Sequence, residues 1–450
     1  MRAIWRLLVE HRDYRALLAA GLVSRTGDYV LTVGLMYLVY DLTGSTVATA
    51  GMLVVSVVPQ MLLASPAGVL VDRWDRRRVL VVTLVAHAVT LLPLLAVHGG
   101  GTLWLLYAVA GVQAVLELLS VPAEQALVPL LVPPERLVSA NALNAQAGSV
   151  ARLVGAGLGG VAAAWGGIVA VTLVDVASFV AAATLVVLVR GAGRGNPVAL
   201  TEEVVGGVPW WHEWRAGLRI AAGSRTLRIL LAFTVVTAVG EGIMGTLFAP
   251  FVLDVLHGGP QGYGLVVGVQ AIGGIAGGLL VAGYGDRLRP ARLFGWGAAV
   301  FGLVDLSLFL YPIAWAHVGP AVVLMIVVGL PGAAVVAGAT TLLQHATLDA
   351  HRGRVLGTVL ALQSAGMLVG AAAAGLLPTL VGGTAGIIAV IAWQGVGYLL
   401  FGVLASTVWV PDDQPRPDDE ASAAAEQREE HRVGAVPVRP QLDGPGALER

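Results

Sequence analysis

The sequence predicts an all-α membrane protein with twelve transmembrane helices in two pseudo-symmetric six-helix bundles. Hydrophobic residues make up 57% of the 450-residue chain and charged residues only 12%, about half the charged fraction of a soluble domain. Roughly twelve segments are apolar over the ~20 residues that a spanning helix needs. An Asp-Arg turn with trailing arginines also occurs twice, at Asp72 and at Asp286, half a chain apart.

The expected spans follow one another with mostly short connections. Four arginines precede the first span, but it is too long for a secretory signal and lacks a small-residue cleavage site, so we expect an uncleaved helix. The spans are expected at 16–40, 47–71, 79–98, 102–125, 138–165, 168–189, 227–251, 262–284, 292–312, 318–345, 355–380 and 384–409.

The placement of arginine predicts the topology, because cytoplasmic connections of membrane proteins are enriched in basic residues. Arginines occur in every second connection, and the connections between them contain none. Both termini are therefore expected in the cytoplasm. Arginine supplies every basic side chain, and Ala, Gly and Val are abundant, a composition typical of GC-rich coding. We accordingly expect a multi-pass protein of the bacterial inner membrane.

One long internal connection divides the chain. Residues 1–190 are expected to form the N-terminal six-helix bundle, 191–226 a cytoplasmic linker, and 227–410 the C-terminal six-helix bundle. Within the linker, Trp210, Trp211 and Trp214 fall near one helical face, which favours a short interfacial helix; a loop tucked under the bundle fits equally well. Residues 411–450 lack periodicity and are rich in charge and proline, so we expect a disordered cytoplasmic tail.

Further matched residues indicate an internal duplication. Gly27-Asp28 in the first span is matched by Gly240-Glu241 in the seventh, 213 residues later, and Asp41 is matched at the same offset by Asp254. Membrane proteins built from two related bundles are mostly transporters, because rocking one bundle against the other moves a site from one face of the membrane to the other.

Several motifs resemble those of a known group. The segment Gly68-Val-Leu-Val-Asp72-Arg73-Trp-Asp-Arg76-Arg77-Arg78 resembles the signature loop between helices two and three of the major facilitator superfamily. Pro122–Pro129, followed by Leu137–Ala142, is similar to the branch that contains macrolide-efflux and enterobactin-exporter-like proteins. The resemblance covers about residues 12–409 and implies the major facilitator fold and a role in multidrug efflux. One departure is Gly155-Ala156, where the exporter pattern has Gly-Pro.

The resemblance also implies a conformational switch. It assigns Gly68, Asp72, Arg73, Arg76 and Arg77 to the switch loop, and Asp286 and Arg287 to its second copy. The carboxylate of Asp72 would face the partial positive charge at the N-terminus of helix eleven and so hold the bundles together on the inside. The arginines would pair with acidic groups or lipid phosphates; alternatively, they only orient the loop.

Six ionisable side chains are expected deep in the bilayer, where each costs roughly 2.5–3.5 kcal/mol and should face a cavity or a partner. The resemblance places helix one at the central cavity, and we hypothesise that Asp28 exchanges a proton with bound substrate. A fixed pair with Arg25, one turn earlier on the same face, is the alternative. The six are Arg25, Asp28, Glu117, Arg152, Glu241 and Asp305.

Glu117 and Glu241 complete the predicted pathway for substrate and protons, together with Arg25 and Asp28. Glu117 would either attract a cationic substrate or form a salt bridge with Arg25 or Arg152. Glu241, as the repeat partner of Asp28, is expected in the same cavity. No role follows from the sequence for Asp175. Arg152, Gln363 and Asp305 are expected as other buried polar residues, the last in a structural role.

These features predict a secondary active transporter that exports an amphipathic small molecule, drug-like or siderophore-like, in exchange for protons by alternating access. The sequence has no cysteine, nucleotide-binding motif, nucleophile cluster or metal-ligand spacing, so we expect neither an enzyme nor a cofactor. The alternatives are an importer or uniporter of the same fold, and a non-transporting receptor or scaffold. Expected partners are the substrate, protons or sodium ions, and the lipid bilayer; no nucleic acid is expected, and the protein is expected to be a monomer.

Overall fold

The computed structural model describes residues 7–97, 99–190, 210–348 and 351–407, and every regular element within them is a helix. The all-α class is therefore confirmed for the described part of the chain. The predicted tail at 411–450 and most of the 191–226 linker lie outside these residues, so the disorder of the tail stays a prediction.

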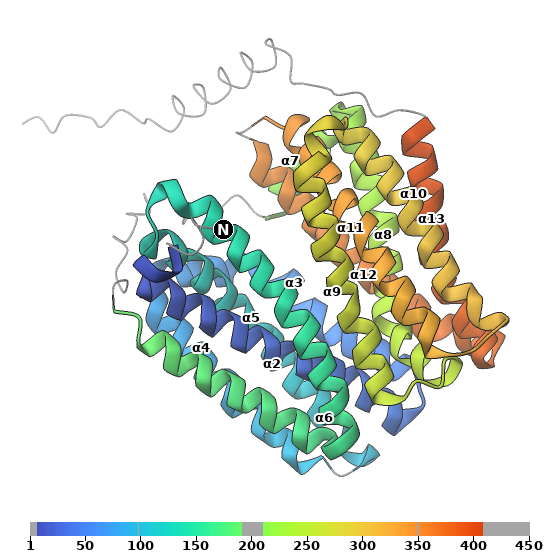
Figure 1. Cartoon of the computed structure of the whole chain (residues 1–450), viewed down its shortest axis with the longest axis horizontal. Helices are drawn as coiled ribbons and strands as arrows, with labels where there is room; N and C mark the ends of the chain where they lie inside the picture. Colours follow the sequence, from blue (N-terminus) through green and yellow to red (C-terminus); the bar gives the residue numbers. More distant parts are fainter. Residues whose placement is uncertain (1–6, 98, 191–209, 349–350, 408–450) are drawn as a thin grey trace, which may run out of the picture.

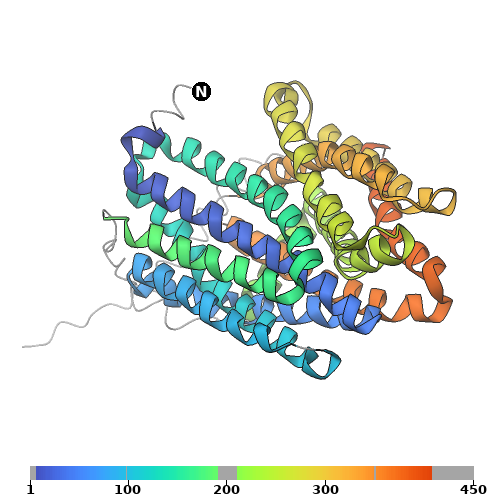
Figure 2. The ribbon, with the colours of Figure 1, turned by 60° about the horizontal axis from the view of Figure 1, so that its bottom comes forward.

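Two groups of helices lie side by side (Figures 1 and 2). Each predicted span coincides with part of a helix to within a few residues. The N-terminal helices are α2 (Arg12–Thr43), α3 (Thr46–Arg73), α4 (Arg76–Leu91), α5 (Leu103–Leu131) and α6 (Leu137–Val187). The C-terminal helices are α7 (Trp210–Gly223), α8 (Arg225–Pro250), α9 (Gly259–Tyr284), α10 (Pro290–Leu310), α11 (Val318–His345), α12 (Arg352–Val381) and α13 (Gly383–Thr407).

Ten helical stretches in the described residues are long and apolar enough to cross a membrane. α2 is not among them, and it is the helix that carries Arg15, Arg25 and Asp28. α6 has 51 residues, far more than the ~20 that one crossing needs. Its helical conformation is broken at Gly167, with φ 54° and ψ −142°, and the ribbon turns back there (Figure 1). Glycine adopts this positive φ readily because it has no Cβ, and the break falls between the two spans predicted at 138–165 and 168–189.

Short polar residues begin several of the helices. The side chains of Ser45 and Ser224 accept hydrogen bonds from backbone N–H groups in the first turns of α3 and α8. The Asp75 carboxylate does the same for α4, at 3.0 Å from the Arg78 nitrogen. Such caps satisfy N–H groups that the helix itself leaves without a partner. Gly44 ends α2 in the left-handed conformation, with φ 58°.

The helix predicted in the linker is present as α7, Trp210–Gly223. Its Gly217 packs so closely against α12 that an added Cβ would contact Thr358 and the backbone of Arg354. Ala221 of α7 is 1% exposed and lies in an apolar cluster with Leu227 of α8. The described part of the linker is a helix, as in the first alternative. This helix packs against the start of α12, as the second alternative expected of a loop under the bundle.

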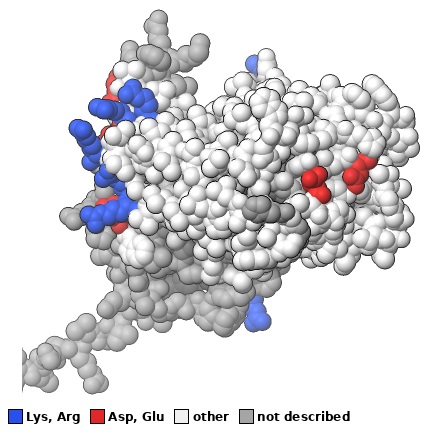
Figure 3. Space-filling model, turned by 90° about the horizontal axis from the view of Figure 1, so that it is seen from below, with Lys and Arg blue, Asp and Glu red and all other residues white. Residues whose placement is uncertain are grey.

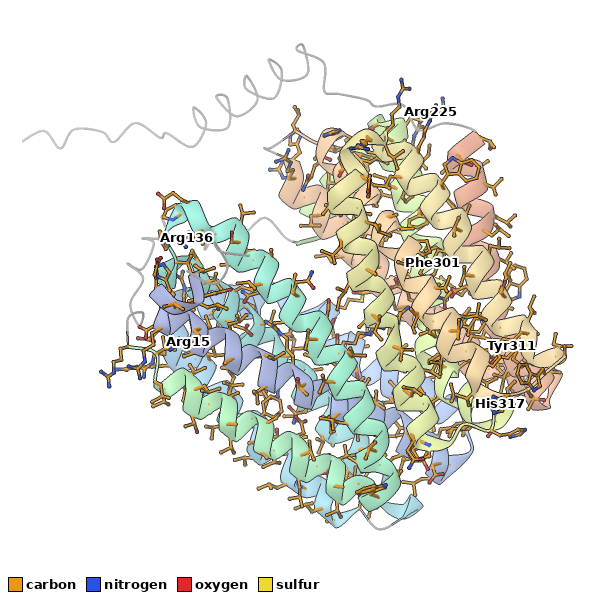
Figure 4. All side chains as sticks on the ribbon, viewed as in Figure 1. Arg15, Arg136, Arg225, Phe301, Tyr311 and His317 are labelled. Atoms are coloured by element: carbon orange, nitrogen blue, oxygen red, sulfur yellow. The ribbon has the colours of Figure 1, made fainter. Side chains whose placement is uncertain are left out.

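The two ends of the helices differ in charge. Arg15, Arg136 and Arg225 lie toward one end, here called the arginine-rich end, whereas Tyr311 and His317 lie toward the other, the arginine-free end (Figure 4). The face seen from below has basic side chains gathered at one edge and is almost free of charge across its middle (Figure 3). This pattern suits a helical layer whose middle contacts lipid.

The two groups of helices contact each other toward the arginine-free end. The Thr46 hydroxyl donates to the Gly375 carbonyl at 2.9 Å, and the Tyr40 hydroxyl donates to the Asp254 carboxylate. Gly160 of α6 faces Gly264 of α9 so closely that a Cβ on Gly160 would lie 3.0 Å from the Gly264 Cα. Small residues allow this approach of backbones within a membrane. Toward the arginine-rich end the ribbons of the two groups diverge (Figure 1).

The contact at the arginine-free end is close enough for a disulfide. A Cβ on Gly375 would lie 3.0 Å from the Ala50 Cβ, near the 3.5–4.5 Å that a disulfide requires. Ala50→Cys/Gly375→Cys is therefore expected to crosslink under mild oxidation, visible as a mobility shift that reductant reverses. The chain has no native cysteine to interfere.

A matched pair at the arginine-rich end serves as control for this crosslink. Val138 and Leu279 are 83% and 67% exposed, on the corresponding ends of α6 and α9. Val138→Cys/Leu279→Cys is expected to remain uncrosslinked in the same oxidant. Equal crosslinking of the two pairs would contradict the arrangement of the helices described above.

Candidate transport cavity

A cavity of about 440 Å³ lies among the N-terminal helices. Most of its wall is aliphatic, with contributions from Leu17, Leu31, Leu35, Met52 and Leu53. All of the described residues that line it fall between positions 17 and 186. Its charged lining residues are Arg25, Asp28, Glu117 and Glu124, and its other polar lining residues include Ser24, Ser56, Gln60, His87 and Gln113.

Three predicted pathway residues thus meet in one cavity. Arg25 and Asp28 project from α2, and Glu117 projects from α5. The side chains of Asp28 and Glu117 are exposed, although both residues lie in the interior part of long apolar helices. Because they line the cavity, water in the cavity can solvate these carboxyl groups, which lowers the cost of placing them in the membrane.

The partner of Arg25 is not the predicted one. Its guanidinium forms an ion pair with the Glu124 carboxylate of α5 at 2.5 Å, with side chains 29% and 12% exposed. A fixed Arg25–Asp28 pair is therefore wrong for this structure. Glu124 follows Glu117 by seven residues, which places both on one face of α5. The sequence signal for Glu124 is therefore its seven-residue distance from Glu117. The sequence analysis did not use it.

Neither Asp28 nor Glu117 forms an ion pair in the described part of the chain. The salt bridge considered between Glu117 and Arg25 or Arg152 is accordingly not formed. Arg152 of α6 instead donates a hydrogen bond to the side chain of Gln270 in α9, which joins the N-terminal and C-terminal helices. The cavity therefore has three carboxyl groups and one guanidinium, and the guanidinium is already paired.

A polar contact between α4 and α5 closes another part of the wall. The His87 ring is hydrogen-bonded to the Gln113 side chain, whose amide also donates to the His87 carbonyl at 3.1 Å. The same ring stacks on Phe179 of α6, with centroids 4.6 Å apart. These contacts fix the imidazole within the wall.

Asp175 lies directly behind α2. Its side chain is fully buried, and its Oδ1 accepts a hydrogen bond from the Ser178 hydroxyl at 3.1 Å. Its Oδ2 has no hydrogen-bond partner in the described residues. Gly27 packs against this group so tightly that an added Cβ would overlap the Ser178 hydroxyl and Asp175 Oδ1.

The polar residues of the C-terminal helices form separate contacts. Glu241 does not line the cavity, contrary to the sequence-based expectation; its carboxylate accepts a hydrogen bond from the Gln363 amide at 3.3 Å. Asp305, 1% exposed, accepts one from the Gln394 amide at 3.0 Å. These bonds join α8 to α12 and α10 to α13.

In the described part of the switch loop, the contacts of Arg77 favour the alternative that this arginine orients the loop. The Arg77 guanidinium donates to the carbonyls of Val186 and Val187, at 3.2 and 2.5 Å, and so caps the end of α6. Arg287 lies over the Tyr284 ring, 5.3 Å from its centroid. The structure gives no described contact for Arg76. The surroundings of Gly68 and the side chains of Asp72, Arg73 and Asp286 lie outside what the structure describes, so the predicted Asp72 latch stays a prediction.

The comparisons with known proteins decide the family. Residues 8–438 match the model of the transmembrane secretion effector family of the major facilitator superfamily. The chain belongs to this family. It is a multi-pass membrane protein of the transporter type, and the sequence-based assignment to the efflux branch of the superfamily is confirmed.

Two relatives of this chain are consistent with membership of this family. Macrolide efflux protein A of Streptococcus pyogenes is 23% identical over 307 residues, which cover 66% of this chain and 75% of that protein. An uncharacterized MFS-type transporter of Mycobacterium tuberculosis is 31% identical over 162 residues, which cover 34% of this chain and 36% of that protein.

Solved structures support the fold. A bacterial homologue of the human lysosomal transporter Spinster, inward-facing and unoccupied, has a TM-score of 0.67 at 16% identity, with 90% of this chain and 98% of that chain covered. The nucleoside transporter NupG has a TM-score of 0.71 at 11% identity, with 88% and 100% covered. At these identities the likeness concerns the fold alone.

The Arg25–Glu124 pair gives a stability prediction. Glu124→Ala leaves a largely buried guanidinium without its counterion, and we expect the free energy of unfolding to fall by about 3 kcal/mol. Denaturant unfolding of the purified protein in detergent measures this loss. The double variant Arg25→Met/Glu124→Met is expected to recover most of it, since no charge remains unpaired.

The ion pair of Glu10 and Arg136 provides the matched control. Its side chains are 51% and 32% exposed, and Glu10→Ala is expected to cost less than about 1 kcal/mol. A Glu124→Ala variant no less stable than Glu10→Ala would contradict the assigned role of the Arg25–Glu124 pair.

Proposed function

We propose that this chain exports an amphipathic small molecule across the bacterial inner membrane in exchange for protons, by alternating access. The observation that carries the proposal is the excess of carboxyl groups in the cavity. Asp28 and Glu117 have no cationic partner among the described residues, and they line a mostly aliphatic wall. Such a site favours either a proton or a cation with an apolar body, because each compensates charge that is costly in a membrane.

The proposed topology has twelve crossings in two six-helix bundles. α6 supplies two crossings because Gly167 breaks it, and α2 supplies one more despite its charges. The 191–226 linker would connect the bundles on the cytoplasmic side. Since basic residues mark the cytoplasmic side, the arginine-rich end and both termini would face the cytoplasm, and we propose a monomer as the working unit.

Closure at the arginine-free end suits uptake of substrate from the cytoplasmic side. In this arrangement the contacts of Thr46 with Gly375 and of Tyr40 with Asp254 hold the outer side closed. Export requires that these contacts separate while the helices close at the arginine-rich end. The implied Asp72 latch would then stabilise the outward-facing state.

The chemistry of the cavity favours a substrate with a basic amine. Macrolides combine a large apolar ring with such an amine, and the macrolide efflux protein of Streptococcus pyogenes named above is related to this chain. We therefore choose erythromycin as the first probe. Protons are the proposed coupling ion, since carboxyl groups bind them directly.

The test uses everted membrane vesicles from a pump-deficient bacterial host. Wild-type vesicles with an acidic lumen are expected to accumulate erythromycin, and one proton that moves down a gradient equivalent to 100 mV supplies about 2.3 kcal/mol, or roughly fiftyfold accumulation. Asp28→Asn is expected to abolish the dependence on the pH gradient, whereas Glu10→Gln, at the surface, serves as the control that leaves it intact.

Two results would count against this function. Equilibration of erythromycin across wild-type vesicles without accumulation, whatever the pH gradient, would indicate a uniporter. Accumulation by vesicles of the opposite orientation would indicate an importer of the same fold.

A further inference from the structure

Asp175 is a buried carboxyl group that the proposed function does not yet use. It is fully buried in the second segment of α6, and its Oδ2 has no hydrogen-bond partner in the described residues. A buried polar atom without a partner is costly, which makes such atoms uncommon unless they have a function. The Ser178 hydroxyl satisfies only the other oxygen, Oδ1, at 3.1 Å.

Gly27 brings this group next to the cavity. An added Cβ on Gly27 would overlap Asp175 Oδ1 and the Ser178 hydroxyl, so Asp175 packs directly against the backbone of α2 at Gly27. The next residue on α2 is Asp28, whose side chain is exposed and lines the cavity. Asp28 therefore follows directly the residue that packs against Asp175, and the charge of Asp175 acts on the Asp28 carboxyl group.

The other charged groups around the pair do not neutralise it. On α2, Arg25 forms its ion pair with Glu124 and also acts on the charge of Asp28, but against three acidic neighbours of that residue. On α5, Glu117 and Glu124 add negative charge near Asp28. On α4, His87 is held by Gln113 and stacks on Phe179, one turn beyond Asp175. The pair therefore lacks a dedicated counterion among the described residues.

At the matching position of the C-terminal helices, a glycine packs closely against a residue that has no carboxyl group. Gly240, the repeat partner of Gly27, packs against Gln394 of α13, and an added Cβ would lie 3.1 Å from the Gln394 Cγ. The Gln394 amide donates to Asp305. In the C-terminal copy an amide thus faces the glycine, whereas in the N-terminal copy a carboxyl group faces it.

We propose that Asp28 and Asp175 form a shared proton site across Gly27, in which Asp28 exchanges protons with the cavity and Asp175 holds the proton away from water. This rests on the proposed proton-coupled export. A proton bound to Asp28 passes to the Asp175 carboxylate through a hydrogen bond that forms when the Asp28 side chain turns toward it: the O–H bond at Asp28 breaks, the bond at Asp175 forms, and one negative charge moves to Asp28. No electron is transferred. A cation that enters the cavity displaces the proton, which returns through Asp28 to cavity water.

The first test measures coupling between the two carboxyl groups without any substrate. Infrared difference spectra of the purified full-length protein in nanodiscs are recorded across a pH titration. Groups that share a proton titrate as a pair, so Asp175→Asn is expected to move the titration midpoint of the Asp28 band by about one pH unit or more. Asp305→Asn, which alters a buried carboxyl group elsewhere, is the control and should leave that midpoint unchanged. An Asp28 midpoint that Asp175→Asn leaves unmoved would overturn the proposal.

The second test separates proton coupling from transport in proteoliposomes, with erythromycin as the probe. Asp175→Asn is expected to lose most of the roughly fiftyfold accumulation that one coupled proton supports at a proton gradient equivalent to 100 mV. Exchange of internal for external erythromycin, which needs no net proton movement, is expected to stay within about twofold of wild type, since the cavity wall is intact. A merely structural Asp175 would reduce both rates together or neither, and either result would overturn the proposal.

Gly27→Ala provides an independent variant. Its added methyl group must displace Asp175 or Ser178, and we expect the same loss of coupling while both carboxyl groups remain. Gly240→Ala, at the matching position, is the control that should retain coupling. If wild type itself shows no proton-driven transport, the proposed function fails, and the infrared titration still decides whether the pair shares a proton.

Discussion

An ionised side chain in the middle of a membrane costs about 2.5–3.5 kcal/mol on insertion scales, and this cost governs where the polar residues of the chain lie. Arg25 is paired with Glu124, Arg152 is bonded to Gln270, and Asp305 is bonded to Gln394. Each partner comes from another helix, so these contacts also fix helix positions. Asp28, Glu117 and Asp175 depart from this pattern, and all three belong to the N-terminal helices.

The three unpaired carboxyl groups give the cavity its chemical character. Two of them face the cavity and one lies behind Gly27. A carrier that moved with all of them ionised would take uncompensated charge through the membrane, which is unfavourable. Binding of a proton or of a cationic substrate removes that barrier. The same electrostatic cost that requires partners for other residues therefore provides a physical basis for coupling in the proposed exporter.

Closely packed glycines allow the two groups of helices to meet at one end. At Gly160 and Gly264 the backbones of α6 and α9 approach without intervening side chains, as small residues allow within a membrane. Thr46 and Tyr40 add a few hydrogen bonds at the same end. A limited contact of this kind suits the opening that the proposed alternating access requires.

Much of the fold followed from the sequence because long apolar runs separated by Gly, Pro and Arg define membrane helices well. The positions of Asp28 and Glu117 on cavity helices followed from the cost of charge together with the family resemblance. The pairing of Arg25 with Glu124 did not, because helices that are apolar on every face have no periodicity to indicate which side meets which neighbour. The placement of Glu241 outside the cavity likewise depends on helix rotation and tilt. The role proposed for Asp175 depends on its contact with Gly27, which the sequence does not indicate.

The central claim is that the acid-lined cavity opens alternately to the two sides of the membrane, and the accessibility of Ser56 tests it most directly. Ser56 lines the cavity, and Ser56→Cys introduces the chain's only thiol. In sealed vesicles of known orientation, a membrane-impermeant maleimide is expected to label this thiol from the cytoplasmic side and, after a change of pH or addition of erythromycin, also from the outer side. Labelling from one side alone, whatever the pH or substrate, would contradict the account.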